Sequence, residues 1–165
     1  MERRTCITPE IQTLLGRESS FVSTEPVDAG KIRRFAKSLG FEDSRYYDWN
    51  GGKPVAPSTF VFSVNHDSGV EMDESGRPTN RLSLGPPFGP AMRAGNRYEF
   101  FQPARVGDLI RVDRKVTDLK EKQGKSGALL FLTYTLKYSN QRGELLGVNT
   151  ETLVFRVEGN GKKVP

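Results

Sequence analysis

The chain has 165 residues, a length typical of one domain, and carries a net charge of +5 from 25 basic and 20 acidic side chains. No apolar stretch approaches the roughly 18 residues that a membrane-spanning helix needs, and no basic-then-apolar leader opens the sequence. The only cysteine and the only histidine, Cys6 and His66, exclude an internal disulfide, a cysteine-cluster zinc site and most chemistry that needs two imidazoles. We therefore expect a cytoplasmic domain with no metal and no cofactor.

The excess of basic residues favours anionic partners, such as phosphate-bearing ligands or acidic carrier proteins. The lysines and arginines are scattered along the chain rather than gathered in a run. This distribution is not typical of a nucleic-acid interface. We therefore expect neither a nucleic acid nor a membrane as a partner.

The first 40 residues predict two helices. Thr8 followed by Pro9 is a typical helix start, and this short helix ends at Gly16. A second helix begins at Asp28 and ends at Gly40, because apolar residues recur between them with helical spacing: Ile32, Phe35, Ala36 and Leu39. We interpret residues 1–27 as an N-terminal helical extension.

A short apolar segment, Phe60–Val64, follows the sequence Pro57-Ser58-Thr59. Because it is apolar on every side, it is typical of either a buried strand or a buried helix, and Pro57 at its start favours the helix. Residues 67–95 are rich in glycine and proline and have no sustained period. They are predicted to form a long loop.

From residue 97 onward the sequence predicts antiparallel strands. Apolar residues occupy every second position from Leu130 to Tyr138, which is the pattern of a strand with one buried face. Helices followed by strands indicate an α+β fold, with one antiparallel sheet packed on one or two helices. Such a sheet leaves an edge strand exposed, so we expect dimerisation through that edge. The strands are predicted at residues 97–102, 109–121, 128–139 and 145–157.

Five sequence motifs occur in an order that resembles the MaoC-like dehydratases, in particular the FAS1-like dehydratase domain. The motifs are Arg34–Gly40 with Tyr46-Tyr47-Asp48, Val55–Phe60, Arg93–Phe100, Gln102–Asp108 and Gln141–Leu145. The resemblance covers most of the chain. It implies a hot-dog fold, in which an antiparallel sheet wraps around a buried central helix, and one such domain over residues 1–165.

The resemblance also implies a substrate and a reaction. Members of this family bind acyl thioesters of coenzyme A or acyl carrier protein and add water reversibly to a 2-enoyl thioester. In active members an Asp, and a His five residues later, handle the water, and these positions fall on Phe41 and Tyr46. Phenylalanine has no ionisable group, and tyrosine, with an ordinary pKa of about 10, is a poor base at neutral pH. We therefore expect no catalytic residue in this chain.

The binding side of the family pattern is retained. The thioester oxygen is expected at backbone N–H groups of Ser58 and Thr59, after Pro57, where the helix dipole adds positive potential. Phe60 either lines an acyl chain or belongs to the core. Four further residues complete the predicted binding set: Asp48, which matches a family Asp in a turn, His66 at the end of the buried helix, and Arg93 and Arg97 as phosphate contacts.

Three functions remain open from the sequence. The first is an acyl-thioester-binding subunit without its own dyad, paired as a homodimer or as a heterodimer with a catalytic MaoC-like subunit. The second is a free-standing hydratase or dehydratase that uses other residues, for instance His66 with Asp67, or Asp43. The third is a hot-dog module that binds small molecules and catalyses nothing.

Overall fold

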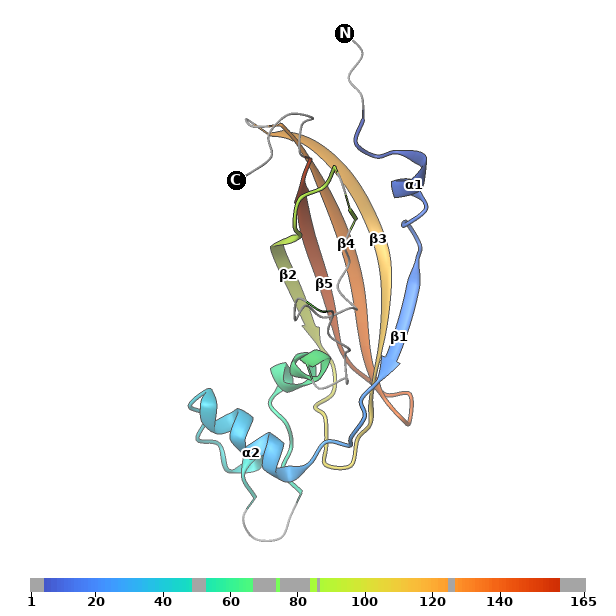
Figure 1. Ribbon diagram of the computed structural model, residues 1–165. Coiled ribbons are helices and arrows are strands. Elements are labelled where there is room, and N and C mark those ends of the chain that lie inside the picture. Colours follow the sequence, from blue (N-terminus) through green and yellow to red (C-terminus); the bar gives the residue numbers. More distant parts are fainter. Residues whose placement is uncertain are drawn as a thin grey trace.

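A computed structural model describes residues 5–48, 53–66, 74, 84–85, 87–124 and 127–157. One five-stranded antiparallel sheet, in the order β1-β3-β4-β5-β2, forms its body, and α2 and η2 lie at one end (Figure 1). This arrangement confirms the predicted α+β class. The elements are α1 (Pro9–Gln12), β1 (Glu18–Val22), α2 (Ala29–Ser38), η1 (Ser44–Tyr46), η2 (Ser58–His66), β2 (Met92–Phe100), β3 (Ile110–Gly124), β4 (Gly127–Asn140) and β5 (Leu145–Arg156).

Strands β3, β4 and β5 form two long hairpins, as predicted. The second hairpin turns at Gly143, whose φ of +76° suits glycine. Side chains of β4 alternate between two faces of the sheet, which we name the inner face and the outer face. The inner face carries the buried residues of β4: Leu130, Leu132, Tyr134, Leu136 and Tyr138. The outer face carries the alternate, more polar positions.

Helix α2 forms where the sequence predicts it. The Asp28 side chain caps it by accepting a 2.8 Å hydrogen bond from the backbone N–H of Lys31. Ile32 and Ala36 are fully buried, and Gly40, with a φ of +71°, allows the chain to leave the helix. The amphipathic pattern thus orients α2 correctly.

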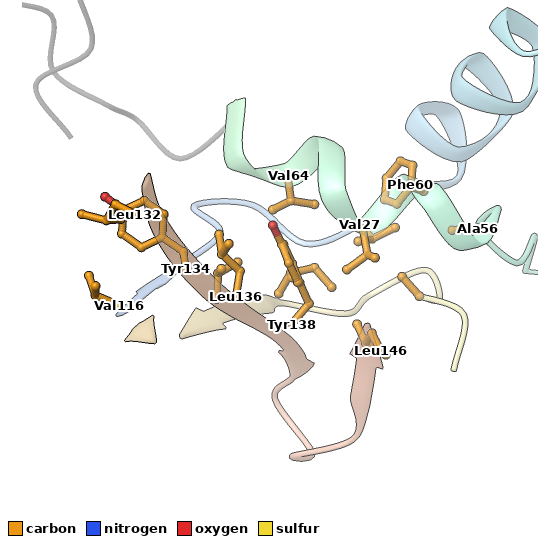
Figure 2. Packing of buried hydrophobic residues seen from close by; sticks show 14 of the residues in the cluster. Val27, Ala56, Phe60, Val64, Val116, Leu132, Tyr134, Leu136, Tyr138 and Leu146 are labelled. Atoms are coloured by element: carbon orange, nitrogen blue, oxygen red, sulfur yellow. The ribbon is translucent and has the colours of Figure 1, made fainter. Parts of the chain in front are cut away.

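The apolar segment after Pro57 is a helix, as Pro57 favours, but it is a 3-10 helix, η2, rather than an α-helix. Its side chains Phe60, Val61 and Val64 are buried in the same core as the inner face of the sheet. In Figure 2, Val64 points from η2 toward Tyr138 of β4. The helix therefore covers one end of the inner face.

Two of the predicted boundaries are wrong. The proposed helical extension contains a strand, because β1 pairs with β3 from Glu18 opposite Lys115 to Val22 opposite Arg111. The predicted loop ends earlier than residue 95, because β2 begins at Met92. Both strands lie at sheet edges, where most side chains are exposed, so they lack the alternation that identifies a half-buried strand. Residues 67–73 and 75–83 of that loop lie outside the described residues.

A buried ion pair joins the turn before β3 to the turn after β4. Asp108 is 1 % exposed, and its carboxylate accepts 2.9 Å hydrogen bonds from the Arg142 guanidinium and from the backbone N–H of Arg105. The side chain of Gln141 adds bonds to the backbones of Gly107 and Leu109. This network explains the motifs Gln102–Asp108 and Gln141–Leu145, because each supplies half of it.

In the part of the chain that the structure describes, no helix is both long enough and apolar enough to cross a membrane.

Candidate functional site

The loop after α2 brings together the two positions at which the family dyad is expected. The rings of Phe41 and Tyr46 lie 5.4 Å apart, with their planes tilted by 33°. The hydroxyl of Tyr47 holds this arrangement, because it donates a 2.5 Å hydrogen bond to the carbonyl oxygen of Phe41. The two positions are neighbours in space, but an aromatic pair occupies them. This pair has no carboxylate and no imidazole with which to activate water.

Asp43, one of the alternative bases, caps η1. Its Oδ1 accepts a 3.0 Å hydrogen bond from the backbone N–H of Arg45, and its Oδ2 lies 3.0 Å from Nε of the same arginine. The Arg45 guanidinium also lies over the ring of Tyr46, 4.8 Å from its centre. The carboxylate of Asp43 is therefore engaged in holding the loop.

The other alternative base pair falls outside the described part of the chain. This is the case for the side chain of His66 and for all of Asp67. Their pairing stays a prediction. Among the described residues, no group of three or more His, Cys, Asp or Glu side chains is placed to hold a metal ion.

Asp48 shapes the turn through its backbone. Its φ is +31°, and its N–H donates to the carbonyl oxygen of Ser44 at 3.0 Å. Arg33 of α2 donates to the carbonyl oxygens of Tyr47 and Asp48 at 2.7 and 3.3 Å. The turn is thus anchored to α2, and a substrate contact of the Asp48 carboxylate stays a prediction.

The first turn of η2 presents free backbone donors. Pro57 is buried, whereas Ser58 and Thr59 are exposed. The first backbone hydrogen bond of η2 runs from the N–H of Phe60 to the carbonyl oxygen of Pro57, at 2.9 Å. No hydrogen bond between described residues uses the N–H of Ser58 or Thr59. These two groups can therefore receive an oxyanion at the positive end of the helix.

The strand pairings around Val55 and Ala56 fix the position of this helix start. The backbone N–H of Ala56 donates to the carbonyl oxygen of Ala104 at 2.9 Å, and Val55 forms an isolated bridge with Arg105. The donors are consequently held against the turn that leads into β3. A rigid anchor of this kind suits a site that must meet a developing charge without rearranging.

Phe60 belongs to the core, since it is 5 % exposed and its ring packs edge-on against Phe35 at 5.4 Å. Phe62, which the sequence analysis did not single out, instead faces the sheet margin. Its ring lies 4.6 Å from that of Tyr98 and 4.9 Å from that of Tyr138. A Cβ at Gly147 would come within 3.0 Å of this ring, so glycine leaves room for it. Phe62 thus packs against both β2 and β5.

The two predicted phosphate contacts on β2 do not converge. Arg93 pairs with Glu151 at 2.8 Å and lies on the inner face, by the register of β2 against β5. Arg97 is opposite Thr150 on the outer face, and its side chain is 77 % exposed. One phosphate cannot bridge these two guanidinium groups. A phosphate contact of either arginine alone stays a prediction.

The sequence of the chain matches a known family over most of its length. Residues 13–147 fit the family model described as the FAS1-like, dehydratase domain region. The chain belongs to this family. Among relatives of the FAS1-like dehydratase domain, UPF0336 protein SCO4636 of Streptomyces coelicolor is 28 % identical over 121 residues. That match covers 68 % of this chain and 75 % of the relative.

Solved structures confirm the fold of this FAS1-like dehydratase domain. The MaoC-like dehydratase from Rhodospirillum rubrum superposes with a TM-score of 0.58 and 22 % identity, covering 88 % of this chain and 94 % of that one. The truncated HadBC (3R-hydroxyacyl-ACP dehydratase) complex from Mycobacterium tuberculosis gives 0.58 and 17 %, covering 86 % and 96 %. The predicted hot-dog fold and the resemblance to MaoC-like dehydratases are therefore confirmed.

Proposed function

We propose that this chain binds an acyl thioester and serves as the subunit without a dyad in an enoyl-thioester hydratase or 3-hydroxyacyl-thioester dehydratase. A second hot-dog subunit, either another copy or a catalytic relative, completes the assembly. The observation that carries this proposal is the aromatic contact between Phe41 and Tyr46, because it occupies the dyad positions with side chains that supply no general base for water at neutral pH.

The retained oxyanion donors support thioester binding. The N–H groups of Ser58 and Thr59 have no partner among the described residues and lie at the start of a nine-residue helix. A thioester oxygen that accepts both bonds would gain the positive potential of the helix end. A subunit that binds the thioester but leaves the chemistry to a partner is expected to keep these donors and to lack the dyad.

The margin of the sheet at β2 supports pairing. Four large apolar side chains on or next to β2 are about half exposed, which is half of the exposed large apolar side chains among the described residues. They form what we name the β2 patch: Met92, Tyr98, Phe100 and Phe101. Since β2 is an edge strand, its outward backbone groups are also available to another strand. The similar HadBC structure is described as a complex, in keeping with a paired subunit.

The first experiment measures hydration of crotonyl-coenzyme A and of a longer enoyl thioester by the purified chain alone. We expect no turnover above buffer, binding of the saturated thioester by calorimetry, and a dimeric native mass. Turnover well above buffer would contradict the proposal and favour the free-standing hydratase, with His66→Ala as the next variant. Absence of any thioester binding would instead favour a module that has left thioester chemistry.

A matched pair of variants at Ser58 tests the oxyanion donors. Ser58→Pro removes the backbone N–H at the first helical position, where proline is tolerated, whereas Ser58→Ala removes only the hydroxyl. We expect the proline variant to bind the thioester about tenfold more weakly, the loss of about one charge-assisted hydrogen bond. The alanine variant should bind as the wild type does. Equal binding by all three chains would place the thioester oxygen elsewhere.

A further inference from the structure

A row of polar side chains crosses the inner face of the sheet beyond η2. Across the strands, Tyr134 of β4 lies opposite Glu151 of β5, and Glu151 lies opposite Asn96 of β2. One pair further along β5, Asn149 lies opposite Tyr98. We name Asn96, Tyr134, Asn149 and Glu151 the polar belt.

The polar belt separates two apolar regions of the same face. On one side lie Tyr138 and the ring of Phe62, which η2 holds against the sheet. On the other side lie Leu130, Leu132 and Phe155, all at most 1 % exposed. Figure 2 shows the same order on β4, since Leu132 and Tyr134 lie beyond the end of η2 while Tyr138 lies beneath it. A core made only for stability would have continued the apolar pattern.

Two acceptors of the polar belt have no donor. The side chain of Asn149 belongs to a residue that is 5 % exposed, and its Oδ1 is buried with no hydrogen-bond partner in the described structure. Oδ1 of Asn96 is likewise buried without a hydrogen-bond partner in the described structure, although Nδ2 of Asn96 donates to the Tyr98 hydroxyl at 2.5 Å. A buried polar atom is normally paired, so two unpaired amide oxygens on one face indicate a partner that the described residues do not supply.

The charges of the polar belt are already balanced. The carboxylate of Glu151 accepts a 2.8 Å hydrogen bond from Nε of Arg93, and its side chain is 16 % exposed. Burial raises the pKa of the Tyr134 hydroxyl, an effect that Arg114 opposes and Glu151 reinforces. The two acceptors without a donor are therefore neutral amide oxygens, and they lie near a tyrosine hydroxyl. These amide oxygens suit a neutral hydrogen-bond donor on a ligand better than an ion.

We propose that the polar belt binds a hydroxyl group carried by the acyl chain of the thioester, at a carbon remote from the thioester itself. This inference rests on the proposed function. A hydroxyl on a hydrocarbon chain fits a polar row between two apolar regions, because it both donates and accepts while its neighbours stay apolar. A plain chain would leave the amide oxygens unpaired.

The position along β5 explains why the hydroxyl is remote. The start of η2 is held against the turn at Ala104. At the other side of the same turn, the backbone N–H of Phe101 donates a hydrogen bond to the carbonyl oxygen of Leu146 at the beginning of β5. Phe62 lies at Gly147, and Asn149 is two strand residues further on, about 7 Å away. The carbon that takes up water lies two bonds from the thioester carbonyl carbon, and its hydroxyl oxygen lies three bonds away, or about 3–4 Å. Such a hydroxyl cannot reach Asn149 while the thioester carbonyl is bound at the start of η2.

The test compares dodecanoyl-coenzyme A with a series of hydroxydodecanoyl-coenzyme A isomers that carry the hydroxyl at successive carbons from the fifth to the last. Calorimetry on the whole chain gives each Kd. We expect one isomer, or two adjacent ones, to bind about tenfold more tightly than dodecanoyl-coenzyme A. Asn149→Leu should abolish this preference, so that the isomer and dodecanoyl-coenzyme A bind with similar Kd values, and Asn96→Leu is the second variant. Thr150→Val, on the outer face of the same strand, should keep the preference.

The outcomes separate this inference from the proposed function. If dodecanoyl-coenzyme A binds and no isomer binds more tightly, the inference fails while the proposed function stands, and ordered water alone satisfies the amide oxygens. If the preference survives in both leucine variants, the hydroxyl binds elsewhere and the inference fails. If no thioester binds to the wild-type chain, both fail.

Discussion

At the scale of single residues, two buried asparagines of similar exposure have opposite environments. Asn140 is 3 % exposed and fully used, since its Oδ1 accepts from the backbone N–H groups of Arg142 and Glu144, and its Nδ2 donates to Glu144. Asn149 is 5 % exposed, and its Oδ1 has no donor in the described structure. One asparagine stabilises a turn, whereas the other is costly in the unliganded chain.

This contrast predicts opposite effects of the same substitution. Asn149→Leu replaces an unpaired polar group by an apolar one of similar size, so we expect it to raise the free energy of unfolding by about 1 kcal/mol. Asn140→Leu leaves two backbone donors without an acceptor, so we expect a loss of about 2–3 kcal/mol. Urea denaturation of both variants measures the difference. A loss of stability in Asn149→Leu comparable with that in Asn140→Leu would show that Asn149 is paired.

At the scale of elements, the hydrogen bonds of the Asp108 carboxylate fix two turns relative to each other. The buried carboxylate connects the turn before β3, through Arg105, to the hairpin between β4 and β5, through Arg142. The same turn also holds the segment before α2, since Val27 exchanges backbone hydrogen bonds with Gly107 and Asp108. The Asp108 side chain thereby joins two connections, and the backbone of its own turn holds a third.

We expect Asp108→Ala to lower the free energy of unfolding by about 3 kcal/mol, because it removes two hydrogen bonds of a buried charge and leaves their donors unpaired. Asp113→Ala is the matched control, since Asp113 pairs with Arg111 on the exposed outer face and should leave the denaturation midpoint unchanged. Denaturation in urea distinguishes the two. Equal midpoints for both variants would contradict a structural role for Asp108.

Which elements the sequence predicts depends on their surroundings. Helix α2 and strand β4 each bury one face, so apolar residues recur along them with the period of a helix or of a strand. Strands β1 and β2 lie at the edges, and Gly95 follows an irregularity in the pairing of β2, so no period marks them. The sheet margins were therefore the part that pattern alone could not reveal.

The candidate site likewise has one part that the sequence predicts and one part that it does not. The start of η2 and the replaced dyad positions, Phe41 and Tyr46, are contiguous in sequence with recognisable motifs. The polar belt is not, because its members come from three strands and meet only through their register. Asn149 and Glu151 were expected in a strand, but nothing local indicates that their side chains point to the inner face. A break in the apolar alternation of the last strand was the available signal.

At the scale of the whole molecule, the sheet ends in two unequal edges. Strand β1 has five residues and is mostly polar, whereas β2 has nine residues and is continuous with the exposed β2 patch. An unpaired edge with apolar side chains is normally covered in the assembled protein. We therefore expect a second hot-dog subunit to pair at the β2 edge rather than at β1.

A pair of charge substitutions tests which edge assembles. Phe101, 55 % exposed beside the end of β2, and Val22, 49 % exposed on β1, are comparably open. We expect Phe101→Glu to convert the dimer to a monomer by native mass spectrometry, because association would bury an unpaired carboxylate. Val22→Glu should leave the dimer intact, and both variants should keep the wild-type circular dichroism. A dimeric Phe101→Glu chain, or a monomeric Val22→Glu chain, would move the interface away from β2.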